Sequence, residues 1–196
     1  MTNELEAQAL DQIFLKARTY IAYTPDPLED KTITAIYDLM KWCPTCVNCQ
    51  AGRFVFVRSP DAKKRLIPCL FPGNIPKVES AAATVIVAHD TRFFEYLASQ
   101  WLAYDASPMY RDNPPLAQET AFRNGSLGGA YLIIAARALG LDCGPMSGFD
   151  NAKVDQEFFR DGRLKSNFLI NIGHGKPDGH YPRGPRLKFE EVVEVL

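Results

Sequence analysis

The stretch from residue 40 to residue 54, MKWCPTCVNCQAGRF, constrains the fold of this chain more than any other. It ends a helical pattern, makes a short polar turn and enters the apolar segment 54–57, which predicts a strand. Thr45, Asn48 and Gln50 give the turn a hydroxyl and two amides. A polar loop between a helix end and a strand start is a common place for a protein to bind a ligand.

Three cysteines at even spacing give the same turn a second interpretation: Cys43, Cys46 and Cys49. Their spacing matches the first part of an iron–sulfur motif, and Cys69 could supply a distant fourth ligand for iron or zinc. However, Arg53 and Phe54 stand where that motif needs its next cysteine. A C-x-x-C redox loop normally precedes a helix that lowers the thiol pKa, whereas this one follows a helix. The context favours a cofactor loop with cysteines at its small positions, and metal or thiol chemistry remains the alternative.

Helical and strand patterns alternate along the rest of the chain. Helices are predicted for residues 5–18, 30–43, 62–70, 91–102, 117–139 and 151–159. Strands are predicted for residues 54–58, 83–88 and 168–173. Residues 71–77 are expected to be irregular, 104–115 to form a loop that is either a lid or a surface insertion, and 143–149 to form a glycine-rich turn. The pattern predicts one layered α/β or α+β domain over residues 1–196.

Glycine and aspartate refine the helix predictions. Asp30 is expected to cap the second helix, and Gly140 to end the long helix in the left-handed conformation. Gly125, Gly128 and Gly129 lie inside that long helix, where each glycine costs roughly 1 kcal/mol relative to alanine. Small residues there suit close approach of another backbone, a ligand or a second subunit.

Charge and composition argue against several classes of function. The formal net charge is -1 and no basic stripe is present, so nucleic-acid binding is not expected. The acidic N-terminal segment does not resemble a signal peptide, and the apolar runs are too short to span a bilayer. An odd count of five cysteines argues against a disulfide framework. We expect a soluble, cytoplasmic protein with no membrane partner.

Common cofactor and catalytic motifs are absent from the sequence. It contains no G-x-G-x-x-G opening a helix, no Walker A sequence and no G-x-S-x-G. The three histidines lie far apart without metal-ligand spacing: His89, His174 and His180. If the protein binds a redox cofactor, the binding site must differ from the Rossmann and Walker A types.

Several segments resemble motifs of the nitroreductase family and occur in that family's order. Residues 44–54 are similar to its Pro-Ser-small-x-Asn-x-Gln-Pro-Trp-Arg-Phe loop. Arg18-Thr19 resembles its N-terminal Arg-Ser phosphate motif, and Arg186 resembles its C-terminal phosphate arginine. Residues 140–150, GLDCGPMSGFD, resemble its Gly-Leu…Pro-x-x-Gly-Phe-Asp segment. The resemblance covers nearly the whole chain.

The resemblance implies an α+β fold with a mostly antiparallel central sheet flanked by helices, in an intertwined homodimer with two FMN sites at its interface. It implies NADPH or NADH as the hydride donor and a small-molecule substrate. Segments 41–42, 120–124, 144–150 and 164–167 are similar to the malonic semialdehyde reductases of pyrimidine degradation, which implies 3-hydroxypropionate as the product. A broad nitro- or quinone reductase is the alternative within the family. A non-enzymatic flavin or metal carrier is the alternative from another class.

The family's cofactor contacts fall on these positions: Arg18, Thr19, Thr45, Cys46, Asn48, Asn74, Pro145, Met146, Ser147, Gly148 and Arg186. The resemblance implies that Arg18 and Arg186 clamp the FMN phosphate, with a further bond from the Thr19 hydroxyl.

The remaining positions are expected to contact the flavin ring and ribityl chain. Thr45 and Asn48 contact both, with Asn48 a candidate for a contact from the other subunit, and Asn74 lies at the ring edge. Pro145–Gly148 lies along the ring, with the backbone N–H groups of its last two residues facing flavin N5 and O4. The resemblance implies no catalytic side-chain nucleophile and no metal.

One position departs from the family pattern. Many relatives carry a second basic residue where this chain has Ile21, and a cation there would stabilise the negative charge of reduced flavin. Lys77 is a candidate replacement. Arg111 or Arg123 could hold a substrate carboxylate, and ordinary surface pairing is the equal alternative.

Overall fold

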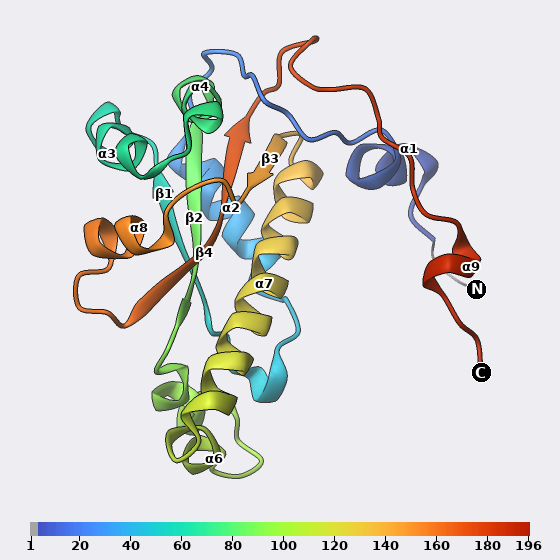
Figure 1. The fold of residues 1–196 in the computed structure, drawn as a ribbon. Coiled ribbons are helices and arrows are strands. Elements are labelled where there is room, and N and C mark those ends of the chain that lie inside the picture. The colour runs from blue at the N-terminus through green and yellow to red at the C-terminus, as the bar shows by residue number, and fades with distance from the viewer. Residues whose placement is uncertain (1–3) are drawn as a thin grey trace.

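A four-stranded antiparallel sheet forms the centre of the computed structural model, which describes residues 4–196 (Figure 1). Its strands are β1 (Gly52–Val57), β2 (Ala83–Asp90), β3 (Asp142–Met146) and β4 (Leu164–Gly173). They lie in the order β1-β2-β4-β3, and each neighbouring pair is antiparallel. The expected α+β fold with a mostly antiparallel sheet is confirmed.

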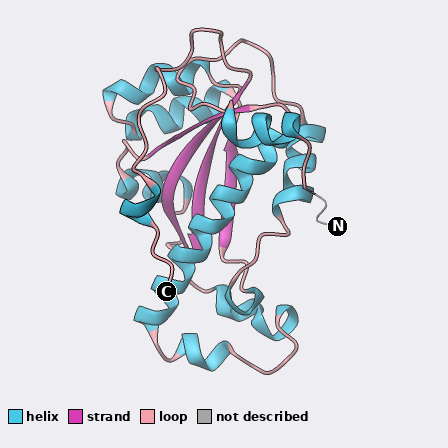
Figure 2. Cartoon of the chain, turned by 90° about the vertical axis from the view of Figure 1, so that its right-hand side faces the viewer, coloured by secondary structure: helices cyan, strands magenta, loops and turns pink. Residues whose placement is uncertain are grey.

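Helices cover both faces of this sheet (Figure 2). They are α1 (Ala7–Leu10), α2 (Asp30–Met40), α3 (Pro60–Leu66), α4 (Ile75–Ser80), α5 (Leu97–Gln100), α6 (Ser107–Arg111), α7 (Pro114–Ala138), α8 (Asn151–Phe158) and α9 (Phe189–Val192). Among residues 4–196, no helix is both long and apolar enough to cross a membrane.

Strand β2 is buried along its full length because it has a hydrophobic core on each side. Val85 and Val87 pack with α2 and α7 through residues such as Ile36 and Leu132. The alternate residues Ile86 and Ala88 belong to the other core, under α3, α4 and α8. Successive strand side chains point to opposite faces, so a strand between two cores has to be apolar throughout.

Three segments that were predicted to be turns, loops or irregular contain regular structure, so these predictions were wrong. Residues 143–149 are largely strand β3, and Pro145 is tolerated because β3 is an edge strand. Residues 104–115 contain α6, and residues 71–77 contain a 3-10 turn and the start of α4. Both helices have a proline in their first turn, where its missing N–H costs nothing.

The remaining differences concern helix ends. The predicted helix 5–18 is α1 followed by a π-helical turn, Asp11–Leu15. The helices expected at 62–70 and 91–102 are each an α-helix combined with a 3-10 turn. Glu29, and not Asp30, occupies the N-cap of α2. Gly140 has a φ of 79°, which confirms the left-handed end of the long helix.

The glycines of α7 allow this helix to approach the sheet closely. A Cβ atom on Gly129 would lie 2.4 Å from the Phe168 ring and 3.1 Å from Val87, both in the sheet. Gly128 would meet the Phe54 ring at 3.0 Å. Side chains of the sheet lie against these glycines, a partner that the sequence did not indicate.

We predict that Gly129→Ala destabilises the protein even though alanine is the better helix former. Overpacking a core typically costs about 1–3 kcal/mol, which exceeds the helix-propensity gain of about 1 kcal/mol. Urea unfolding measures the effect. Gly73→Ala is the matched control, because nothing lies within 4 Å of its added Cβ. A Gly129→Ala protein as stable as the wild type would contradict the packing.

Candidate functional site

The N-terminal segment lies along the edge strand β3. Thr19 forms a parallel bridge with Cys143, and the Tyr20 N–H donates to the Cys143 carbonyl at 3.1 Å. A Cβ on Gly144 would lie 2.3 Å from the Tyr20 carbonyl oxygen, so only glycine permits this approach. The predicted phosphate residues Arg18 and Thr19 are thereby brought beside the strand that leads into residues 145–148.

Asn74 holds the turn that follows β3. This buried side chain donates from Nδ2 to the Gly148 carbonyl at 2.8 Å and accepts at Oδ1 from Lys77 Nζ, also at 2.8 Å. A Cβ on Gly148 would lie 2.4 Å from Asn74 Nδ2. The backbone N–H groups of Ser147 and Gly148 donate to no other residue within 4–196, so both are open to a ligand.

The C-terminal tail passes beside the N-terminal segment (Figure 1), and arginine side chains of each segment donate to carbonyls of the other. Arg18 donates to the Tyr181 carbonyl, and Arg183 donates to the carbonyls of Leu15 and Ala17 at 2.6 and 3.0 Å. Within residues 4–196, Arg186 donates hydrogen bonds only to carbonyls of its own tail. The structure therefore shows no contact between the two arginines of the predicted clamp.

We group Arg18, on the N-terminal segment, with Arg183 and Arg186, on the tail that contacts it, as the arginine cluster. None of its members forms an ion pair with a carboxylate among the described residues. Carbonyl partners leave the guanidinium charges uncompensated, which suits an anion such as a phosphate. Sequence analysis missed Arg183 because it belongs to no quoted motif and meets its partners across the fold.

The Thr45 loop, residues 43–50, lies at the entrance to β1. Thr45 Oγ1 accepts from the Gln50 N–H at 3.2 Å, and the Cys46 N–H donates to Asn124 Oδ1 on α7 at 2.9 Å. Asn48 Nδ2 donates to the Gln100 carbonyl at 3.0 Å. Val47 has a φ of 45°, which is rare for a β-branched residue and indicates local backbone strain.

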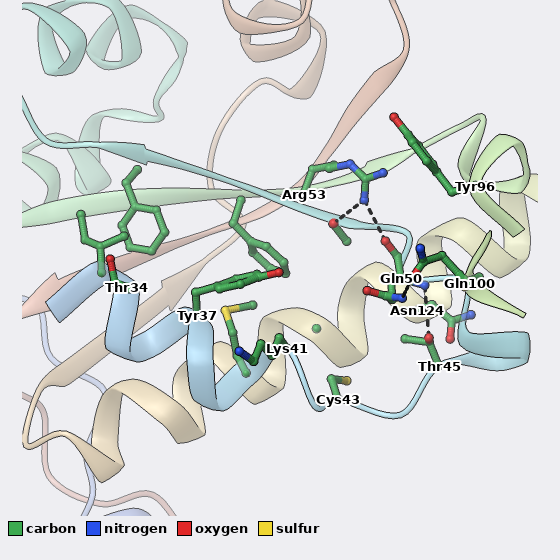
Figure 3. Close-up of a pocket in the computed structure, with 17 residues that line it drawn as sticks. Thr34, Tyr37, Lys41, Cys43, Thr45, Gln50, Arg53, Tyr96, Gln100 and Asn124 are labelled. Carbon is green, nitrogen blue, oxygen red and sulfur yellow. Dashed lines mark hydrogen bonds between the residues drawn. The ribbon is translucent and has the colours of Figure 1, made fainter. Parts of the chain in front are cut away.

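A cavity of about 680 Å³ opens beside this loop, between α2, β1 and α7 (Figure 3). Its apolar walls include Tyr37, Phe54 and Phe56, and polar groups from Thr45 and Gln100 also line it. Thr45 is the one predicted flavin contact in this lining.

The predicted cofactor residues thus form two groups. The Thr45 loop enters β1, whereas Thr19, Asn74 and residues 145–148 lie around β3. These strands are opposite edges of the sheet, three strand spacings or about 14 Å apart. Arg123 pairs with Glu119 on α7, and neither it nor Arg111 lines the 680 Å³ cavity.

The cysteines of the loop have different surroundings. Cys46 is exposed and contacts the Tyr110 hydroxyl at 3.5 Å, whereas Cys49 is buried, which raises its pKa to about 11. Among residues 4–196, no three His, Cys, Asp or Glu side chains are grouped as a metal site. Burial also raises the pKa of Cys143, to about 12. Burial identifies Cys49 and Cys143 as packing residues, whereas Cys46 is exposed.

We predict that a disulfide reagent such as DTNB at pH 8 modifies Cys46 first among the five thiols of the folded, FMN-free protein, and that added FMN slows this modification because Cys46 is an expected cofactor contact. Cys43 should follow more slowly because partial burial raises its pKa, and the buried thiols should react only after unfolding. Cys46→Ala should remove the fast phase, and Cys143→Ala should leave it unchanged. Rapid modification of Cys49 would contradict the packing role.

A buried ion-pair network holds the end of the Thr45 loop. Asp90 is 1% exposed, and its carboxylate accepts from Arg53 at 2.9 Å and from Arg163 at 3.0 Å. Arg53 also donates to the Gln50 carbonyl at 2.8 Å, while the Tyr96 ring lies 5.4–5.6 Å from both guanidinium groups. Sequence analysis missed this network because its members are separated along the chain by tens of residues.

Comparisons with known proteins place the chain in a family. The profile described as "Nitroreductase family" matches residues 15–174. The chain belongs to the nitroreductase family. It is 54% identical, over the whole of both chains, to a Rhodopseudomonas palustris (strain TIE-1) protein named "Putative NADH dehydrogenase/NAD(P)H nitroreductase".

Solved structures of similar proteins share the fold. The "putative nitroreductase ydfN" of Bacillus subtilis is 23% identical and superposes with a TM-score of 0.86, covering 96% of this chain and 99% of its own. A "putative nitroreductase in complex with FMN" of Exiguobacterium sibiricum is 20% identical with a TM-score of 0.85, covering all of both chains.

Proposed function

We propose that this nitroreductase-family protein is an FMN-dependent NAD(P)H oxidoreductase. The observation that carries the proposal is the pair of open N–H groups at Ser147 and Gly148, at the end of the strand that Thr19, the neighbour of Arg18 in the arginine cluster, bridges. The pair would donate to acceptor atoms of a flavin ring, and the cluster would bind its phosphate. The FMN-bound Exiguobacterium relative and the names of the close relatives support this cofactor and donor.

The protein's part in the reaction would be to position and polarise the cofactor. Arg18 and Arg186, together with Arg183, would hold the phosphate, and Thr19 would add a hydroxyl bond. Asn74, held by Lys77, would fix the Gly148 carbonyl so that the two N–H groups face the ring. Bound FMN would supply the redox chemistry, taking a hydride from NADPH or NADH and passing it to the substrate, so no side-chain nucleophile is needed.

A homodimer would unite the two groups of cofactor residues. In this arrangement Thr45, Cys46 and Asn48 of one copy cover the site around β3 of the other. Phe14, Tyr181 and Phe189 are each at least half exposed on the N-terminal and C-terminal segments, which supports a covering partner. Each copy would contribute to both sites, as two-fold symmetry requires.

We propose malonic semialdehyde as the substrate, which takes a hydride and a proton to give 3-hydroxypropionate in pyrimidine degradation. The resemblance of segments 120–124 and 144–150 to that subfamily supports it. A broad nitro- or quinone reductase is the second candidate, and the names of the close relatives favour it.

We predict that the purified protein, after incubation with FMN and gel filtration, has a two-band flavin spectrum that NADPH or NADH bleaches. The reduced protein is then mixed with malonic semialdehyde, a quinone or a nitroarene, and recovery of the oxidised spectrum is timed. Fastest recovery with malonic semialdehyde supports the first substrate, and fastest recovery with the other acceptors supports the second. Protein that retains no FMN would overturn the proposed function.

We predict that two inactive variants restore each other's FMN binding. Arg18→Gln removes a phosphate contact, and the double variant Thr45→Val/Asn48→Leu removes the loop contacts. Each alone should bind FMN weakly. After unfolding and refolding together in equal amounts, half of the dimers are mixed and each has one intact site, so about a quarter of the wild-type FMN capacity should return. Sites built within one chain would give no recovery.

A further inference from the structure

A second cavity, of about 410 Å³, lies where the end of β2 meets α6 and the start of α7. Its polar lining residues are His89, Thr91, Tyr110, Arg111, Gln118 and Lys165. None of the positions expected to contact FMN lines it. Its volume falls within the range of small-ligand sites, about 300–1,000 Å³.

The charged residues in the wall of this cavity are cations. Arg111 and Lys165 line it, and no aspartate or glutamate does. Arg111 forms no ion pair or hydrogen bond with any residue within 4–196, although Asp105 lies within electrostatic range of it, and Lys165 has one carboxylate partner, Asp155, at 3.5 Å. An unpaired guanidinium in a concave site presents a fork of donors that matches a carboxylate.

His89 adds an unused polar group to the same wall. The side chain is 6% exposed and packs edge-on against Phe122, with ring centroids 5.9 Å apart. Its Nδ1 is buried and has no hydrogen-bond partner among the described residues. Its Nε2 is not buried in this way, and it too bonds to no described residue. Because His89 lines the cavity, Nε2 is the ring atom available to a ligand.

The protonation state of His89 suits a donor to an anion. Burial lowers the pKa of the ring, outweighing Asp155 and Asp90, which act in the opposite direction. The ring is therefore neutral at pH 7 and has one N–H. With its proton on Nε2, the ring would donate a hydrogen bond into the cavity. The buried Nδ1 would then be an acceptor without a proton, so no donor would be left unpaired.

The remaining walls are apolar and define the body of the ligand. Phe94, Pro114 and Ala117 line the cavity, and the Tyr110 ring closes the side toward the Thr45 loop, where its hydroxyl contacts Cys46. Apolar walls with a few converging polar groups are typical of sites for small organic ligands.

We propose that this cavity binds a small carboxylate with an apolar body. The carboxylate accepts bonds from Arg111 and from His89 Nε2, Lys165 adds charge, and the body packs against Phe94 and Pro114. No expected FMN contact lines the cavity, so its ligand is distinct from the cofactor, and Arg111, considered above for a substrate carboxylate, is assigned to this cavity.

Benzoate is a suitable probe, and the imidazole signals of the FMN-saturated protein report where it binds. The chain has three histidines, and His89→Gln identifies the His89 ring signals by their loss. Benzoate should shift these signals saturably and leave those of His174 and His180 in place. Benzamide, which has the same shape without the charge, should bind at least about tenfold more weakly.

Arg111→Gln should raise the benzoate concentration at half-saturation of the His89 shift by about tenfold or more. Arg123→Gln is the matched control, because Arg123 lies on the exposed face of α7, pairs with Glu119 and does not line the cavity. Benzoate that leaves the His89 signals unmoved would overturn the proposal. Equal binding by the two variants, or equal binding of benzamide and benzoate, would overturn it as well.

Discussion

The fold depends on the burial of β2 on both of its faces. This strand pairs with β1 on one side and β4 on the other, and its alternate side chains enter the two hydrophobic cores. Full burial of a large aliphatic side chain stabilises a protein by about 1.5–3 kcal/mol, so a strand with Val85, Ile86 and Val87 contributes heavily. Because β2 fills the centre of the sheet, the polar chemistry of the molecule is left to the edges, the strand ends and the loops.

The two edge strands carry the proposed cofactor site in different ways. Strand β3 is short and contains Gly144 and Pro145, so it pairs weakly and leaves open backbone donors at its end. The N-terminal segment pairs with its outer side and brings Arg18 near the tail. Strand β1 instead receives the Thr45 loop, which Arg53 and the buried Asp90 anchor. One edge offers charge and backbone donors, and the other offers a strained polar loop beside an apolar cavity.

Sequence reasoning located the elements that bury apolar surface and failed where structure depends on distant partners. α2 and α7 follow helical patterns and β2 and β4 contain apolar, β-branched runs, so their positions were predicted with errors only at the ends. β3 was missed because its glycine and proline suggest a turn, and only the pairing of residues 142–146 with β4 makes it a strand. The motif resemblance supplied most of the candidate site. It could not supply Arg183 or the Asp90 network, since contacts that cross the fold leave no local pattern in the sequence.

The uncompensated charge of the arginine cluster has a consequence for the stability of the fold. Arg18 is partly buried and donates to a neutral carbonyl, so its guanidinium loses part of its hydration without gaining a countercharge. Binding an anionic cofactor would restore that balance and hold the tail against the N-terminal segment. Any ligand that binds the folded state alone stabilises it in proportion to RT ln(1 + [L]/Kd). The tail and the N-terminal segment bury little apolar surface of their own, so they are the parts of the fold whose order would depend most on cofactor and partner.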